Sequence, residues 1–314
     1  MRNHKLVIIA TVVILLVLGW GVAAAADEKY EEKFNKTESI APEGKVKVSN
    51  ISGDIWVRTW DKAEVQINAL KWSRASSMEK AKDNAALVKI EVNKVGDGLE
   101  ILTKYPEGHH KNLNVSVNYE LMIPAKGSLA ASTVSGDVKV EKIGGTLKAA
   151  TVSGDVTVNG AAKGVDARTV SGDVTVSDVV GDAYLNTVSG DVKADRIAGS
   201  IEAETISGEA ELMDVSQARA LTIKVLSGNI NYVGKLNKDG RYTFKSHSGD
   251  VNVTIPADSA FDLSSETFSG DITTDFKVAV SGRISKKELN GTVNGGGAEL
   301  NLKSFSGDIK LKKS

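Results

Sequence analysis

Apolar and polar residues alternate with a period of two along the middle of the chain. In residues 156–158 and again in residues 165–167, two apolar residues flank one polar residue. This period is typical of a β-strand with one buried face and not of a helix. Glycines such as Gly145 and Gly154 interrupt the alternation, and a glycine inside a strand pattern marks a bend or a bulge. The pattern therefore predicts short strands, each followed by a corner.

The alternation repeats at a fixed step. Thr-Val-Ser-Gly-Asp begins at Thr133 and recurs at equal steps at Thr151, Thr169 and Thr187, and Thr205 opens a Thr-Ile-Ser-Gly-Glu version. Related Ser-Gly-Asp triplets begin at Ser52, Ser227, Ser248, Ser269 and Ser306, where the steps lengthen to 20, 21, 21 and 37 residues. A short fixed period indicates one structural unit stacked on copies of itself.

One such unit cannot bury its apolar face alone, but a chain that coils so that each unit lies on the next can. Successive coils then pair as parallel strands about 4.8 Å apart. An antiparallel meander is the rival arrangement, although it would not need identical steps between successive corners. We predict an all-β fold, a single-stranded parallel β-helix (a β-solenoid) of about 18–21 residues per coil. Its predicted internal columns are Val138, Val156, Val174 and Val192; Val140, Val158 and Val176; and Leu147, Val165, Ala183 and Ile201.

The residues before the regular repeats divide into two further regions. Residues 1–26 have the features of a signal peptide, and residues 27–127 form a β-rich N-terminal cap region. The solenoid is predicted over residues 128–314. Ser76-Ser77-Met78-Glu79 resembles a capping box, which predicts one short helix near residues 77–87. The cap region would cover an end of the stack whose open strand edges otherwise invite association.

The N-terminus predicts export. A basic start is followed by an apolar run over residues 6–22 and by four alanines that end at Ala26. This is the pattern of a secretory signal peptide, with cleavage predicted after Ala26. The run is at the short end for a membrane span, so an uncleaved anchor over residues 6–22 is the alternative. Both interpretations place the protein in the periplasm, on the outer surface or outside the cell.

The composition narrows the class of partner. The chain has no cysteine, so neither a disulfide nor lipid attachment through cysteine is available. Lys and Arg number 39 against 40 Asp and Glu, with no basic block, so nucleic acid is not an expected partner. We expect an envelope or surface component, protein or glycan, as the partner, and the sequence leaves the oligomeric state open.

The corners carry a column of acidic residues. Glycine tolerates positive φ, and Asp beside it can accept hydrogen bonds from backbone N–H groups. We predict that these carboxylates cap the corners. Calcium held between coils is the alternative, because hard cations favour clustered carboxylates, and no other metal or cofactor is expected. The predicted corner ladder is Gly136, Gly154, Gly172 and Gly190 with Asp137, Asp155, Asp173 and Asp191, and these four Asp are the calcium candidates.

Three other groups of residues are candidates for binding. Trp56, Arg58 and Trp60 predict a sugar- or partner-binding platform, with packing beneath the cap helix as the alternative. His109-His110, with His247 as a third ligand, would make a metal site, but their spacing favours a solvated loop. The Thr and Ser of each Thr-Val-Ser-Gly predict a flat outward array of hydroxyls. Ice binding is one use of such arrays, and the strand propensity of Thr explains them equally well.

Several of these motifs together resemble a known family. They are Val-Ser-Asn-Ile-Ser-Gly-Asp-Ile at residues 48–55, Trp60-Asp61, Ile123-Pro124, the serial Thr-Val-Ser-Gly-Asp-Val, and Asn290-Gly291 followed by Asn294-Gly295-Gly296-Gly297. They resemble a bacterial family of unknown function whose members are called putative adhesins, built as β-solenoids with Ser-Gly-Asp repeats. The resemblance covers residues 45–311 and implies a β-helical fold and a location in the cell envelope. It brings no catalytic residues with it.

The predicted function is therefore that of a non-enzymatic, exported envelope protein that presents a rigid β-solenoid surface for adhesion or scaffolding. The regular repeats leave little room for loops that could build a catalytic pocket. A polysaccharide-acting β-helix enzyme is one alternative. A membrane-anchored periplasmic sensor or assembly accessory is the other.

Overall fold

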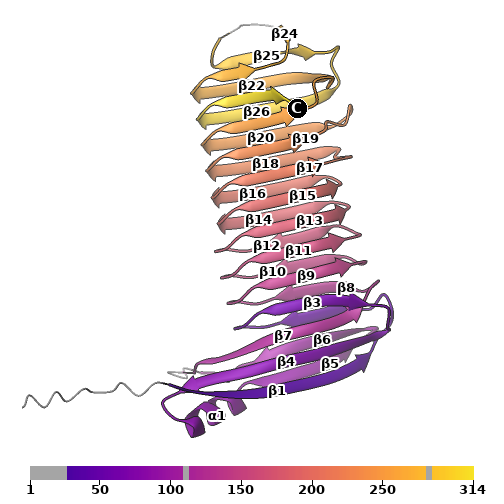
Figure 1. Ribbon diagram of the computed structural model, residues 1–314, viewed down its shortest axis with the longest axis vertical. Coiled ribbons are helices and arrows are strands. Elements are labelled where there is room, and N and C mark those ends of the chain that lie inside the picture. The colour runs from indigo at the N-terminus through magenta and orange to yellow at the C-terminus, as the bar shows by residue number, and fades with distance from the viewer. Residues whose placement is uncertain (1–26, 109–112, 281–284) are drawn as a thin grey trace, which may run out of the picture.

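The structure, a computed structural model, describes residues 27–108, 113–280 and 285–314. Within them the chain forms a rod of stacked coils with one short helix at its lower end (Figure 1). Two sheets run along the rod, sheet A with 13 strands and sheet B with 14. Each coil contributes one strand to each sheet, and neighbouring coils pair in parallel. The prediction of an all-β parallel solenoid is confirmed.

Ten coils carry a corner of the Ser-Gly-Asp type, with the sheet B strand before the corner and the sheet A strand after it. From the N-terminal end of the rod they are β2 (Lys45–Ser49) with β3 (Ile55–Trp60), β8 (Ser128–Ser132) with β9 (Val138–Ile143), β10 (Leu147–Ala150) with β11 (Val156–Ala161), β12 (Val165–Arg168) with β13 (Val174–Val180), β14 (Ala183–Ser189) with β15 (Val192–Ala198), β16 (Ile201–Ser207) with β17 (Ala210–Val215), β18 (Ala220–Ser227) with β19 (Ile230–Gly234), β20 (Arg241–Ser248) with β21 (Val251–Ile255), β26 (Ala298–Ser306) with β27 (Ile309–Lys313), and β22 (Phe261–Ser269) with β23 (Ile272–Thr274).

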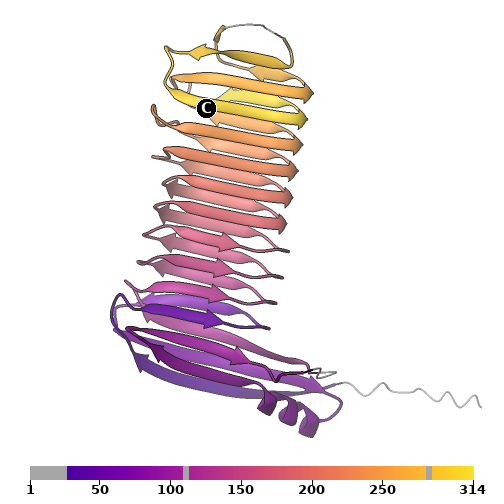
Figure 2. The ribbon, with the colours of Figure 1, turned by 180° about the vertical axis from the view of Figure 1, so that it is seen from behind.

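The chain does not stack its coils in sequence order at the C-terminal end. The last coil, β26 and β27, lies between the coil of β20 and β21 and the coil of β22 and β23. The chain thus first forms the coil of β22 and β23, which leaves one coil position empty below it. It then turns back through β24 (Ala279–Val280) and β25 (Glu288–Val293), and β26 and β27 fill that position. This insertion accounts for the 37-residue step, and it leaves the C-terminus short of the tip of the rod (Figures 1 and 2).

The N-terminal end shows a similar insertion. The coil of β2 and β3 lies between the coil of β8 and β9 and a pair formed by β6 (Gly98–Lys104) and β7 (Val115–Pro124). Residues 45–60 are therefore part of the stack, although the sequence analysis assigned them to the cap region. The stack ends in antiparallel strands: β5 (Lys89–Val95) beside β6, β4 (Glu64–Ala75) beside β7, and β1 (Glu28–Ser39) beside β4.

The helix α1 (Met78–Leu87) packs against β1 and β4 at this end (Figure 1). Ser77 is its N-cap, and the Ser77 hydroxyl accepts a hydrogen bond from the backbone N–H of Lys80. Ala81 and Ala85 form its buried face. No helix among the described residues has the length and apolar character needed to cross a membrane.

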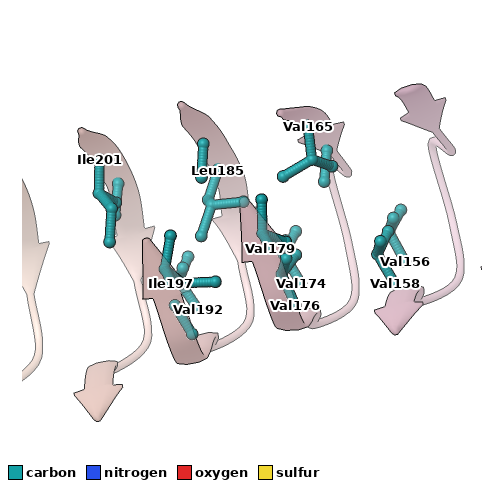
Figure 3. Packing of buried hydrophobic residues seen from close by; sticks show 14 of the residues in the cluster. Val156, Val158, Val165, Val174, Val176, Val179, Leu185, Val192, Ile197 and Ile201 are labelled. Atoms are coloured by element: carbon teal, nitrogen blue, oxygen red, sulfur yellow. The ribbon is translucent and has the colours of Figure 1, made fainter. Parts of the chain in front are cut away.

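The core is a set of columns that run through the coils. Val138, Val156, Val174 and Val192 lie in register on consecutive strands, and each is fully buried. The column from Leu147 to Ile201 is equally in register on sheet B. Figure 3 shows part of both columns, with Val156, Val174 and Val192 from the first and Val165 and Ile201 from the second. Apolar burial stabilises by about 25 cal/mol per Å² of surface removed from water. Each coil buries its apolar side chains against the coils next to it, so most of its contribution to stability comes from contact with these neighbours.

Candidate functional site

The corner glycines occupy positions that no other residue fits. Gly154 has a φ of +142°, and a Cβ there would lie 2.2 Å from the carbonyl oxygen of Gly136 in the preceding coil. Gly172 and Gly190 are closer still, at 2.0 Å from the corresponding oxygen. A positive φ disfavours side chains, and the close approach of two backbones excludes them. The glycine column is a requirement of stacking.

The corner aspartates hydrogen-bond from coil to coil. Asp155 Oδ1 accepts a 2.8 Å bond from the backbone N–H of Asp173, and the N–H of Asp155 donates to Asp137 Oδ1 at 2.9 Å. The ladder runs from Asp54 through Asp137, Asp155, Asp173 and Asp191 to Glu209. Each carboxylate from Asp54 to Asp191 is thus bonded by an amide of the next coil, which offsets the repulsion in a column of like charges.

The calcium alternative stays a prediction to be tested. Within residues 27–108, 113–280 and 285–314, no three side chains of His, Cys, Asp or Glu gather closely enough to hold a metal ion. His109 and His110 lie outside these residues. His247 lies on β20, where its ring stacks on Phe305 at 4.8 Å between centroids.

The threonines point inward, so the prediction of an outward hydroxyl array is wrong for Thr, whereas the Ser of each repeat is exposed as predicted. Thr151 is only 5% exposed, and its hydroxyl donates a 2.9 Å bond to the carbonyl oxygen of Gly136. Thr169, Thr187 and Thr205 repeat this bond to Gly154, Gly172 and Gly190. The next residue in each repeat faces outward instead.

Those outward residues form a feature that the sequence analysis missed. In all ten coils the residue before Ser-Gly is apolar or aromatic, and eight of the ten are between 43% and 68% exposed. The only sequence signal of its outward orientation is its position: it directly follows the buried Thr, and neighbouring residues of a strand face opposite sides. We call the column the apolar stripe; in spatial order it is Ile51, Val134, Val152, Val170, Val188, Ile206, Leu226, His247, Phe305 and Phe268.

Two places before the stripe, a second column faces outward on sheet B. We call it the outer row; in the same order it is Ser49, Ser132, Ala150, Arg168, Asn186, Glu204, Lys224, Lys245, Lys303 and Glu266. Over the six coils from Val188 to Phe268, the stripe and the outer row form the walls of an open groove of about 650 Å³. Its floor is the row of buried residues that includes Thr187, Thr205 and Val225.

The predicted platform lies on the outer face of sheet A. Trp56, Arg58 and Trp60 are alternate residues of β3, so they share one face. Arg58 stacks its guanidinium 4.4 Å from the centre of the Trp56 ring, and Lys139 Nζ approaches the same ring at 5.4 Å. Lys62 lies over Trp60 at 4.6 Å, and Trp60 Nε1 donates to the carbonyl oxygen of Glu64. Since α1 packs against β1 and β4, the cap helix does not account for these rings.

Comparison with known proteins places this geometry in a family. The profile of the Toastrack DUF4097 family matches residues 45–312. The chain belongs to this family. Its match spans the ten corner-bearing coils and the N-terminal pair of β6 and β7. Among curated proteins, none matches the chain.

Several solved structures are similar to it. A putative adhesin from Bacteroides fragilis is 13% identical, over 89% of this chain and 97% of that one, with a TM-score of 0.40. A putative adhesin from Parabacteroides distasonis is 15% identical, over 90% and 97%, with a TM-score of 0.32. A putative cell adhesion protein from Clostridium sporogenes is 11% identical, over 91% and 100%, with a TM-score of 0.30.

Proposed function

We propose that this Toastrack protein is an exported, non-enzymatic envelope protein that works as an adhesin-like binding rod. The observation that carries the proposal is the cluster of cations and indole rings on β3, held on a rigid stack of coils. We call it the β3 surface: Trp56, Arg58, Trp60, Lys62 and Lys139. The export part of the proposal rests on the signal-peptide pattern of residues 1–26.

The stacked Arg58 suggests the chemistry of the ligand. Its guanidinium lies against the Trp56 ring, and it has no carboxylate partner among the described residues. A stacked guanidinium keeps the N–H groups at its edge available, and these fit carboxylate and phosphate groups in a bidentate way. Lys139 adds a second cation whose own acidic neighbour, Glu141, lies 3.7 Å away and exposed. We therefore propose an acidic glycan of the cell envelope as the ligand.

The rod gives this surface a fixed position. Strand β3, which carries Trp56 and Arg58, is paired with β7 along its whole length and with β9 from Ile55 to Val57, which holds the backbone beneath the surface in place. Residues on strands are placed more rigidly than residues on loops, which lowers the entropy cost of binding. The remaining coils would then act as a spacer between the β3 surface and the opposite end of the rod.

The test is a glycan-array screen with the protein purified from cells that express the complete coding sequence. We expect binding to acidic glycans that falls at least about tenfold in Arg58→Ala and Trp56→Ala, because each removes one main contact. Tyr184→Ala is the matched control, since Tyr184 is an aromatic residue of sheet B that is 51% exposed. Equal loss in the control, or turnover of any glycan by the protein, would contradict the proposal.

A further inference from the structure

The apolar stripe is longer than a monomer normally leaves open to solvent. Its ten residues lie on ten stacked coils, so at about 4.8 Å per coil it extends over roughly 43 Å. Monomeric soluble proteins rarely expose continuous apolar surfaces of this extent, and such surfaces mark interaction sites. We propose that the stripe is the interface of an antiparallel homodimer in which two rods lie side by side.

The order of side-chain sizes along the stripe favours a second copy in the antiparallel direction. The stripe begins with Ile51 and four valines and ends with Leu226, His247, Phe305 and Phe268. In an antiparallel pair, Val134 faces Phe305, Val152 faces His247, and Val170 faces Leu226. Away from the middle of the rod, each coil then pairs a smaller side chain with a larger one, so the two rods can keep one separation along the whole contact. A parallel pair would set Phe against Phe at one end, and Ile51 and the valines against their own copies at the other.

The distance between coils also favours a second copy of this chain as the partner. Two copies of this chain have the same distance between coils, so contacts that match at one coil also match at the next. An extended peptide advances about 3.3 Å per residue and would lose this match within a few coils. The backbone under the stripe is already paired in sheet B, so it offers a peptide no free ladder of hydrogen bonds. A peptide bound there would bury its own polar groups without partners.

In the antiparallel dimer, the outer row of one copy also complements the outer row of the other in side-chain size. Its first residues, Ser49, Ser132 and Ala150, are short, whereas Lys245, Lys303 and Glu266 at its other end are long. A separate hollow of about 250 Å³ lies at the short end; its lining includes Ser132 and Ala150, with Lys47, Lys148, Asp166 and Arg168 as its charged residues. In the antiparallel pair, the second copy's long lysine side chains come to lie over this hollow.

Five of the six charged residues of the outer row already pair with a residue of their own chain. Lys224 and Lys303 pair with acids of their own chain, Glu204 and Glu266, while Lys245 has no acidic partner among the described residues. In the dimer, Lys245 faces Ala150, beside a hollow whose charged lining residues are Lys47, Lys148, Asp166 and Arg168, so this contact rests on packing of the long side chain and not on charge attraction. Among the residues of the outer row that face each other, the one like-charged pair is Arg168 with Lys224, and each already pairs with an acid of its own chain, Asp166 and Glu204 respectively. The stripe and the outer row supply 20 residues per copy, within the range of about 20–30 per side in stable interfaces.

The absence of cysteine makes the orientation directly testable. Single-cysteine variants of the full chain would be mixed in pairs and treated with a short bis-maleimide. We expect Val134→Cys to cross-link to Phe305→Cys, and Val134→Cys alone not to cross-link, because its two copies would lie about 34 Å apart. Cross-linking of Val134→Cys to itself would overturn the antiparallel arrangement.

Sedimentation measures the dimer itself. We expect the protein to sediment at twice the chain mass, and Leu226→Asp to raise the dissociation constant at least about tenfold. Val233→Asp is the matched control, because Val233 lies on the same coil in sheet A and is 41% exposed against 52% for Leu226. A monomeric wild-type protein, or a dimer that Leu226→Asp leaves intact, would overturn the proposal. Glycan binding by Leu226→Asp should persist, since the β3 surface lies on sheet A.

Discussion

The hydroxyl of Thr151 donates a 2.9 Å hydrogen bond to the carbonyl oxygen of Gly136, 15 residues earlier in the chain. Thr151 follows the sheet B strand of one coil, and Gly136 is the corner of the coil before it. The bond therefore joins two coils at the edge where strand pairing gives way to the turn. It also fixes which residue faces outward, because an inward Thr151 places Val152 in the apolar stripe.

Replacing Thr151 with valine tests the value of this bond. The change keeps the shape of the side chain and removes its donor, so we expect a loss of about 1 kcal/mol in the free energy of unfolding. Thr157→Val is the control, since Thr157 lies on the outer face of β11 and is not buried. Urea denaturation of both variants measures the difference. An equal effect at the two positions would show that the buried bond contributes nothing specific.

The corner glycines predict a larger effect. Gly154→Ala combines a disfavoured φ with a Cβ 2.2 Å from a backbone oxygen, so we expect a loss of at least about 3 kcal/mol. Gly96 also has a positive φ, but nothing lies within 4 Å of a Cβ there. Gly96→Ala should then cost only about 1 kcal/mol, the strain of the backbone alone. Similar melting temperatures for the two variants would contradict the close-approach argument.

The sequence was sufficient to predict the stack because equal steps between the corners leave little freedom of register. Val156 and Val174 must pair if their corners pair, and they do. The order of the terminal coils could not be predicted in this way. A 37-residue step gives the length of the detour through β24 and β25, but it does not say on which side of β22 the chain returns. That choice depends on contacts between residues far apart in sequence.

The apolar stripe was missed for a different reason. Counting every second residue from the buried Leu147 puts Ala149 and Thr151 inside and Val152 outside. A strict period of two therefore predicts the observed orientation of Thr151 and Val152. Residue type favours the opposite assignment, because Thr is polar and Val is apolar. The hydrogen bond to Gly136, which no sequence pattern shows, is what makes an inward Thr favourable.

The corner ladder predicts the response to calcium removal. The carboxylate oxygens already accept backbone N–H bonds, so we expect a chelator to leave the melting temperature unchanged. Asp155→Asn should also have little effect, because an amide oxygen can accept the same bond. Asn229 does so for the N–H of Asp250 at 2.9 Å. Asp155→Ala removes the acceptor and should cost about 1 kcal/mol. A calcium-dependent shift of several degrees that Asp155→Asn abolishes would favour a metal site instead.

One corner carboxylate predicts a dependence on pH. Lys310 Nζ lies 2.9 Å from Asp250 Oδ2, and this hydrogen bond holds the pKa of Asp250 below its usual value of 3.8. A carboxyl with a lowered folded-state pKa stabilises the fold above its unfolded pKa, and this contribution is lost as pH falls through the folded value. Lys310→Met should therefore reduce stability at pH 6, and this loss should shrink as pH falls below 3.8 and through the lower pKa of the folded state. Thermal melts at a series of pH values measure the difference, and a loss that stays the same at every pH would rule out the ion pair as its cause.

A charge placed in the middle of the core should divide the rod. Val156 lies between Val138 and Val174 with no exposed surface, so Val156→Asp buries a carboxylate that has no partner. The cost of several kcal/mol falls on one coil and its two neighbours, because each coil contacts only those. The coils on either side keep their own columns and can melt separately. We expect Val156→Asp to lower the melting temperature and to split one thermal transition into two, measured by calorimetry. Thr157→Asp, on the outer face of the same strand, should retain a single transition. If Val156→Asp also unfolded in one transition at the wild-type temperature, the columns could not be the main source of stability.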